Sequence, residues 1–269
     1  MMVLMRKTCL FVLWATVLLV AMPPVFAGQW TERSDLAEIF ERHNAVGTFA
    51  LHDISNDQLV LVNSNRAAER WFPASTFKIA NSLLALETGV IADENEVIPY
   101  GGKPQMFKSW ERNMSIRDGI KISNVPVFQE LASRIGIDRY QKWLAVLHYG
   151  NAQIGEDVRT FWLKGPLKVS PIEQVRFLSK LAQKKLPLSQ RSQTVVTEII
   201  RLENKGTSVL YGKTGWSGAS SPEIGWFVGW VEGEKGIFTF AMNMDIVSKR
   251  DAKKRKFLVK LLLNRLGVY

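Results

Sequence analysis

The apolar and polar positions of the chain follow two different periods, which divide it into three blocks. In the first block, two short strand-like runs occupy 46–54 and 58–62, and Ser55-Asn56-Asp57 separates them. Polar turn formers between two such runs are typical of a β-hairpin. The pattern therefore predicts a hairpin in the first quarter of the chain.

A second block of strand-like runs lies far along the chain, at 208–213, 224–231 and 236–244. Between the two blocks, apolar residues recur every three or four positions, which is the period of a helix. The clearest example is 75–88, which stops before Gly89 as a helix would. Further helices are predicted at 127–135, 138–147, 172–186 and 257–266.

This order of elements predicts the fold class. Strands at both ends of a chain with helices between them favour one sheet assembled from both ends, with a helical lobe inserted into it. We therefore expect an α/β (α+β) protein with a central, mainly antiparallel sheet. The sheet lobe would comprise about 28–70 and 205–269, and the helical lobe about 71–204. An active site would lie in the groove between these lobes, where pockets commonly form.

The first residues of the chain have the pattern of an export signal. Arg6 and Lys7 precede an apolar run at 9–20, and Val25-Phe26-Ala27 supplies the small residues of a cleavage site. The run is shorter than the roughly 20 apolar residues of a spanning helix, which favours a cleaved signal peptide over a retained anchor. We expect a signal peptide at 1–27 and a single mature domain at 28–269, with no membrane segment after cleavage.

Composition narrows the function classes. Cys9 is the only cysteine and lies in the predicted leader, so the mature chain would have no disulfide, cysteine nucleophile or cysteine-ligated metal. The formal net charge is +10, and a basic surface can attract nucleic acid. An exported protein meets little nucleic acid, and the cations are dispersed except at 249–256, so we expect no nucleic-acid partner.

The strongest local signal is Pro73-Ala-Ser-Thr-Phe-Lys78. Ser75 and Lys78 are three positions apart and would share one helix face, with Ser75 in the first turn, where free amides favour negative charge. A serine hydroxyl needs a nearby base to become a nucleophile, and a buried lysine can lose its proton and serve as one. The S-x-x-K motif alone is weak evidence, because chance supplies it in many helices.

Two further motifs follow in a fixed order and strengthen this interpretation. Ser123-Asn124-Val125 comes after a short polar segment that suits a loop of the helical lobe, and Lys213-Thr214-Gly215 follows a strand-like run. The second motif would offer a cation, a hydroxyl and a closely approachable backbone at a sheet edge. S-x-x-K, S-D-N and K-T-G together are the signature of class A β-lactamases and penicillin-binding proteins.

The sequence resembles class D β-lactamases, the oxacillinase group, over essentially the whole of 28–269. Beyond the three motifs above, the resemblance rests on 149–151 (Tyr-Gly-Asn), 161–163 (Phe-Trp-Leu), Trp216 and 224–230. Tyr149-Gly-Asn151 and Val125 distinguish class D from its relatives. The resemblance implies the penicillin-binding-protein transpeptidase fold in one catalytic domain. It also implies hydrolysis of β-lactam antibiotics in the periplasm, and hence antibiotic resistance.

The valine at 125 has a physical consequence. Val125 offers no hydrogen bond where related enzymes carry an amide, and with Phe77 and Trp162 it could keep water from Lys78. Burial disfavours an ammonium and lowers its pKa. The resemblance implies that the neutral Lys78 amine takes up carbon dioxide, forming N6-carboxylysine as general base, and that Trp162 is the partner of this carbamate. Carbon dioxide or bicarbonate would be needed, with no other cofactor and no metal.

The resemblance also implies the remaining roles in the site. The amides of Ser75 and Trp216 would form the oxyanion hole. Ser123, close to Lys213, would pass a proton to the leaving ring nitrogen. The substrate-binding residues would be Val125, Tyr149, Thr214, Gly215 and Arg255. Arg250 is the alternative to Arg255, and the family also links a tyrosine at 149 with inhibition by chloride.

Other readings of the sequence remain open. His43, His52 and His148 lack the spacing of a metal site or a catalytic triad, so we expect surface or packing roles for them. A penicillin-binding D-alanyl-D-alanine peptidase and a non-hydrolytic β-lactam sensor domain share the serine and lysine motifs. The peptidase is disfavoured by Val125 and Trp162, and the sensor by the single removable leader. Neither the substrate spectrum nor the choice between monomer and homodimer can be read from the sequence.

Overall fold

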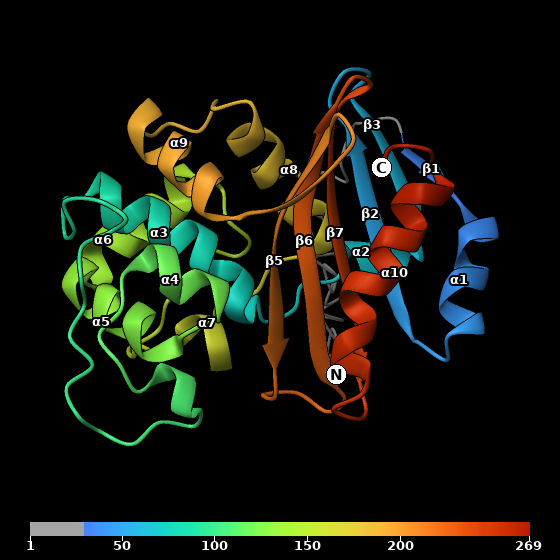
Figure 1. Ribbon diagram of the computed structural model, residues 1–269. Coiled ribbons are helices and arrows are strands. Elements are labelled where there is room, and N and C mark those ends of the chain that lie inside the picture. The colour runs from blue at the N-terminus through green and yellow to red at the C-terminus, as the bar shows by residue number, and fades with distance from the viewer. Residues whose placement is uncertain (1–29) are drawn as a thin grey trace, which may run out of the picture.

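The computed structural model describes residues 30–269, and the predicted leader lies outside this range. A seven-stranded sheet forms its centre, in the order β1-β3-β2-β7-β6-β5-β4 (Figure 1). All neighbouring strands are antiparallel except β1 (Trp30–Glu32) and β3, which are parallel. The mainly antiparallel sheet built from both ends of the chain is therefore confirmed. Among residues 30–269, no helix has the length and apolar character needed to cross a membrane.

The predicted hairpin is present as β2 (Gly47–Asp53) and β3 (Gln58–Val62). Its turn is stabilised by Asp53, whose Oδ1 accepts hydrogen bonds from the amides of Ser55 and Asn56 at 2.9 and 3.3 Å. Strand β2 also pairs with β7 along its whole length. The first strands of the chain thus join the last ones directly in one sheet.

The strands of the second block are longer than predicted. They are β5 (Ser208–Ser217), β6 (Glu223–Gly233) and β7 (Gly236–Ile246). A further strand, β4 (Arg201–Lys205), was not predicted and pairs with the start of β5. Strand β5 continues to Ser217 because its pairing with β6 continues to Ser217 and Ile224. The Lys213-Thr-Gly motif therefore lies inside a strand, although its residues have little strand propensity of their own.

Helices cover both faces of the sheet (Figure 1). On one face lies the helical lobe, in which α8 (Pro171–Ala182) contacts β2, β6 and β7. On the other face, α10 (Asp251–Arg265) packs on β5, β6 and β7, beside α1 (Ala37–Arg42). The remaining helices of the lobe are α3 (Lys78–Glu87), α4 (Ile116–Lys121), α5 (Val125–Ile135), α6 (Ile137–Val146), α7 (Phe161–Lys164) and α9 (Gln190–Ile199). A further short helix, α2 (Ser64–Ala68), follows the first hairpin.

Helix α3 is the centre of the helical lobe. A 3-10 turn, η2 (Ala74–Phe77), leads into it, and every residue from Lys78 to Leu86 is buried. The helices predicted at 75–88, 127–135, 138–147 and 172–186 correspond to η2 with α3, and to α5, α6 and α8. Helix α9 was not predicted because it is polar at most positions and buries only a narrow stripe, which includes Val196 and Ile199.

Candidate active site

Ser75 and Lys78 lie at the junction of η2 and α3. Ala74, just before Ser75, has a left-handed backbone with φ of +49°, so the chain turns sharply into the helix. The Nζ atom of Lys78 is hydrogen-bonded to Ser75 Oγ at 2.8 Å. A hydroxyl that is the expected nucleophile thus lies within proton-transfer distance of an amine.

The surroundings of Lys78 are apolar. The residue has no exposed surface, and its Nζ atom lies 5.2 Å from the centre of the Phe128 ring. Burial, and to a smaller extent the nearby Lys213, lowers the pKa of Lys78 well below its usual value. An amine in this environment is available as a neutral base or nucleophile.

Trp162 packs behind this pair. Its ring stacks on Phe77 with centroids 5.6 Å apart, and the whole residue is buried. Its indole Nε1 has no hydrogen-bond partner among residues 30–269. A buried donor without an acceptor is unfavourable, so the position favours an acceptor group beside it. Val125 begins α5 and is half-buried.

Ser123 is held between α4 and α5 in a left-handed conformation, with φ of +59°. The next residue, Asn124, caps α5, because its Oδ1 accepts a hydrogen bond from the amide of Val127 at 3.1 Å. The Nζ atom of Lys213 lies 2.9 Å from Ser123 Oγ and 2.9 Å from the Thr214 carbonyl. Burial lowers the pKa of Lys213 to about 7, with smaller effects from Arg255 and Lys256.

The motif on β5 lies along an open strand edge. Strand β4 pairs only with 208–211 of β5, and the Gly212 amide still donates to Ile200 O at 2.9 Å. Backbone groups alternate in direction along a strand, so the N–H and C=O of Thr214 and Trp216 face the same edge as those of Gly212, where β4 no longer covers them. The Trp216 amide is therefore available to a ligand in the groove.

Gly215 brings this strand close to the serine. A Cβ atom at this position would lie 3.0 Å from the Pro73 carbonyl oxygen and 3.0 Å from Thr76 Cγ2. Such contacts are tighter than most side chains tolerate, so glycine is needed for β5 to approach η2. The structure thus assigns Gly215 a packing role, and its expected contact with substrate stays a prediction.

The two candidate arginines differ in position. The Nη1 atom of Arg255, on α10, donates to the Gly215 carbonyl, and its Nε donates to Ala252 O at 2.7 Å. Its guanidinium lies 5.9 Å from the Trp216 ring centre. Arg250 is exposed at the start of α10. The fold therefore brings Arg255 to the motif on β5.

Tyr149 does not lie at the surface of the groove. It is 1% exposed, and its ring packs edge-on against Phe77 and Phe177 at centroid distances of 5.6 and 5.0 Å. Its hydroxyl accepts a hydrogen bond from Gln174 Nε2 at 3.3 Å. Direct contact with substrate is therefore not available to Tyr149, and its influence on the site would pass through Phe77. The expected link with chloride inhibition stays a prediction.

The histidines lie away from these residues. His43 packs against Phe257, and His52 is buried between Ser179 and Asp57, with hydrogen bonds of 2.8 and 2.9 Å. This chain of serine, histidine and aspartate is not a catalytic triad, because Ser179 is buried and its hydroxyl donates to the Val175 carbonyl. Over the described range 30–269, no group of His, Cys, Asp and Glu is arranged to hold a metal ion.

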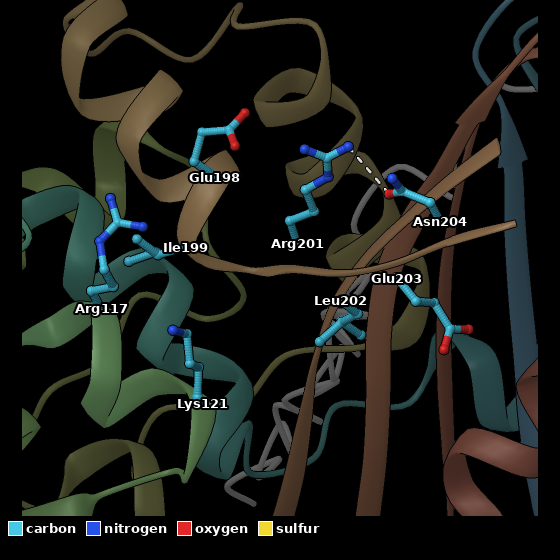
Figure 2. A pocket seen from close by; sticks show the side chains of 8 residues that line it. All are labelled: Arg117, Lys121, Glu198, Ile199, Arg201, Leu202, Glu203 and Asn204. Atoms are coloured by element: carbon cyan, nitrogen blue, oxygen red, sulfur yellow. Dashed lines mark hydrogen bonds between the residues drawn. The ribbon is translucent and has the colours of Figure 1, made fainter. Parts of the chain in front are cut away.

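A polar hollow of about 460 Å³ lies between Lys121 and Arg201 (Figure 2). Lys121, on one wall, is two residues before Ser123, and Arg201, on the other, pairs with Tyr211. Arg201 donates to Asn204 Oδ1 at 3.2 Å, and Arg117 pairs with Glu94 outside the hollow. None of the motif residues lines this space, so it is separate from the cluster of Ser75, Lys78, Ser123 and Lys213.

Two residues near the site, Phe128 and Glu223, were not predicted from the sequence. Phe128 contacts Lys78 from α5, but in the sequence it is one of several apolar residues on one helix face. Glu223, the first residue of β6, accepts a hydrogen bond from Trp216 Nε1 at 2.5 Å. Only the pairing of β5 with β6 brings Glu223 to the groove, so no local signal could have identified it.

Comparisons with known proteins agree with this geometry. The penicillin binding protein transpeptidase domain family matches residues 41–263. Beta-lactamase OXA-5 of Pseudomonas aeruginosa is 40% identical over 232 residues, which cover 85% of this chain and 87% of that protein. Beta-lactamase OXA-48 of Klebsiella pneumoniae is 37% identical over 261 residues, which cover 97% and 98%. The solved structure of FUS-1 (OXA-85), a class D β-lactamase from Fusobacterium nucleatum subsp. polymorphum, has a TM-score of 0.86 and 41% identity, covering 88% of this chain and 99% of that one.

Proposed function

The chain belongs to the class D serine β-lactamases, and on this basis we propose how its residues open the β-lactam ring. The enzyme hydrolyses β-lactam antibiotics and so confers resistance to them. The roles of individual residues are our proposal. The observation that carries it is the 2.8 Å hydrogen bond between Lys78 Nζ and Ser75 Oγ in a site that excludes water from the lysine.

We assign the attack to Ser75. As its proton passes to the base on Lys78, the Ser75 oxygen bonds to the lactam carbonyl carbon. The negative charge that develops on the carbonyl oxygen would be stabilised by the amides of Ser75 and Trp216, each worth about 3 kcal/mol in comparable oxyanion holes. The open edge of β5 at Trp216 supports this role.

Lys78 is well suited to carry a carbamate. Its lowered pKa leaves a neutral amine that can react with carbon dioxide, and Trp162 Nε1 is a buried donor with no acceptor in the described part of the chain. A carbamate would supply an anionic oxygen that serves as general base both toward Ser75 and toward the water that releases the product. Trp162 would hold it by a hydrogen bond, and Phe77 and Phe128 would keep bulk water from it.

The other half of the groove serves the leaving group and the substrate carboxylate. When the bond between the lactam carbonyl carbon and the ring nitrogen breaks, we assign Ser123 the delivery of a proton to that nitrogen, because Lys213 Nζ is hydrogen-bonded to the Ser123 hydroxyl at 2.9 Å. Thr214 and Arg255 would bind the substrate carboxylate, for which a guanidinium offers two parallel hydrogen bonds. Val125 and Gly215 would line the groove beside the bound substrate.

We also propose that the enzyme is exported to the periplasm after removal of residues 1–27. The basic start of the chain, the short apolar run and the small residues at 25–27 support this. Edman sequencing or intact mass measurement of the periplasmic protein would test it. A mature chain that begins well away from Gly28 would contradict the predicted cleavage site.

Hydrolysis of a chromogenic β-lactam, with and without bicarbonate, tests the proposed mechanism. We expect Ser75→Ala and Lys78→Ala to lose at least about a thousandfold in rate, as removal of a nucleophile or its base does elsewhere. Bicarbonate should restore activity to enzyme depleted of carbon dioxide. Carbon-13 bicarbonate should label Lys78, and an unlabelled lysine in fully active enzyme would disprove the carbamate.

Mass spectrometry during turnover separates hydrolysis from the other readings. A D-alanyl-D-alanine peptidase or a sensor domain would keep a long-lived adduct on Ser75, whereas a hydrolase releases it. We expect the adduct to disappear as soon as the substrate is consumed.

A further inference from the structure

Glu223 lies beside the groove at the end of β5. Its Oε2 accepts the hydrogen bond from Trp216 Nε1 at 2.5 Å. Its Oε1 would lie 3.2 Å from a Cβ atom at Gly218, so glycine leaves room for the carboxylate over the turn that follows β5. The carboxylate therefore has a defined position next to the residue whose amide we assign to the oxyanion hole.

This carboxylate is not neutralised by the protein. Within residues 30–269, Glu223 forms no ion pair with any lysine, arginine or histidine. The neighbouring side chains of the groove, Lys213 and Arg255, are basic, and Arg255 lies over the Trp216 ring. Glu223 is thus an unpaired negative charge among the described residues, near the basic side chains of Lys213 and Arg255.

The order of groups along β5 fixes which part of a substrate reaches Glu223. In a penicillin, the carboxylate is attached beside the ring nitrogen, and the acylamino side chain is attached on the far side of the lactam carbonyl. With the carboxylate at Thr214 and the carbonyl at the Trp216 amide, the acylamino side chain extends toward Gly218. Two residues of strand span about 7 Å, which is the reach of that side chain.

We propose that Trp216 and Glu223 form the subsite for the acylamino side chain and select its charge. The subsite favours penicillins with a protonated amine on the carbon next to the side-chain carbonyl over those with a carboxylate there. The indole provides an apolar face for the phenyl ring, and the Glu223 carboxylate attracts an ammonium group and repels an anion. This inference rests on the proposed function, because it assumes the substrate orientation given there.

Three penicillins that differ only at this carbon test the inference. Benzylpenicillin is neutral there, ampicillin carries an amine and carbenicillin carries a carboxylate. We would measure kcat/KM for each at about pH 6.5, below the usual α-amino pKa of about 7.7, so that the amine is charged. The variants are Glu223→Gln, which keeps an acceptor for Trp216 Nε1, and Glu232→Gln, which removes an exposed charge at the other end of β6.

One partly exposed charge changes a binding equilibrium about two- to fivefold. Glu223→Gln removes both the attraction for the ammonium group of ampicillin and the repulsion of the extra carboxylate of carbenicillin. The ratio of kcat/KM for ampicillin to kcat/KM for carbenicillin should therefore fall at least about fivefold in Glu223→Gln and stay unchanged in Glu232→Gln. Added salt should lower the same ratio in the wild-type enzyme, since salt screens a partly exposed charge. This second measurement applies even where Glu223→Gln fails to fold.

The outcomes are distinct. Equal ratios in the wild-type enzyme and Glu223→Gln, with all three penicillins hydrolysed, would overturn the charge selection and leave the proposed function intact. A wild-type ratio that does not respond to salt would also overturn it. Failure of the wild-type enzyme to hydrolyse benzylpenicillin would instead contradict the proposed function.

Discussion

The Nζ atom of Lys213, on β5, lies 2.9 Å from the hydroxyl of Ser123, in the turn between α4 and α5. This hydrogen bond crosses the groove and joins the sheet to the helical lobe. On the other side of the groove, Lys78 is hydrogen-bonded to Ser75 in the same way. Each serine therefore has its own buried lysine, and the charge of Lys213 adds to the effect of burial in lowering the pKa of Lys78.

The pH profile should report the charge of Lys213. Its pKa of about 7 means that the proton is present below this pH and lost above it. Because we assign Ser123 and Lys213 to protonation of the leaving nitrogen, kcat/KM should decline as the pH rises through about 7. In the enzyme–substrate complex, the substrate carboxylate favours the protonated form of Lys213. The decline in kcat should therefore occur at a higher pH than the decline in kcat/KM. In Lys213→Arg, which keeps its charge throughout, the decline should vanish.

Stability should rise with pH over part of the alkaline range. The pKa values of Lys78 and Lys213 are both lowered by burial in the folded protein, whereas in the unfolded chain they return to about 10.4. The unfolded state then binds more protons between about pH 7 and 10, so the free energy of unfolding increases over this interval, by the order of a few kcal/mol. Urea unfolding at several pH values measures the rise.

The substitution Lys213→Met gives a control for this rise. Methionine has a similar length and no proton to lose, so the variant should gain stability near neutral pH and show a smaller increase toward pH 10. A variant with the same pH dependence as the wild-type enzyme would argue that Lys213 is not responsible.

Trp162→Phe tests the partner of the carbamate. Phenylalanine keeps the stacking on Phe77 but removes the Nε1 donor, and loss of a hydrogen bond to a charged group is worth about 1.5–3 kcal/mol. We expect a decrease in rate of about 10- to 100-fold that high bicarbonate partly reverses. Trp230→Phe is the matched control. Trp230 is also buried, its Nε1 has no acceptor within residues 30–269, and it stacks on Tyr211 instead of Phe77. Equal loss in both variants would indicate a packing effect.

Arg255→Ala should weaken binding of the substrate carboxylate. Because a guanidinium binds a carboxylate through charge-assisted hydrogen bonds, we expect kcat/KM to decrease about 10- to 100-fold, mainly through KM. Arg250→Ala removes the same charge from an exposed position five residues earlier and should leave both constants nearly unchanged. A larger effect of Arg250→Ala would reverse the assignment of the two arginines.

Much of the fold could be predicted from local sequence. The hairpin at 47–62, the helix after Ser75 and the final helix follow from periodicity and turn formers, because each pattern is complete within one element. Helix α9 and the second half of β5 could not be predicted, because neighbouring elements stabilise them. The ordered motifs identified Ser75, Lys78, Ser123 and Lys213 as a set, but the spacing of the motifs along the chain did not predict the distances between these side chains.

The sequence by itself determined the chemistry that is available: a serine three residues before a lysine, a second serine, a second lysine and no cysteine after Cys9. Only the tertiary structure decided how that chemistry is arranged. In the folded protein, Lys78 is buried beside Phe128 and Tyr149 is buried behind Phe77. Arg255, rather than Arg250, contacts the Gly215 carbonyl, and Glu223 lies beside Trp216. These outcomes depend on contacts between elements that are distant in sequence, and burial and electrostatic effects arise only once those elements pack together.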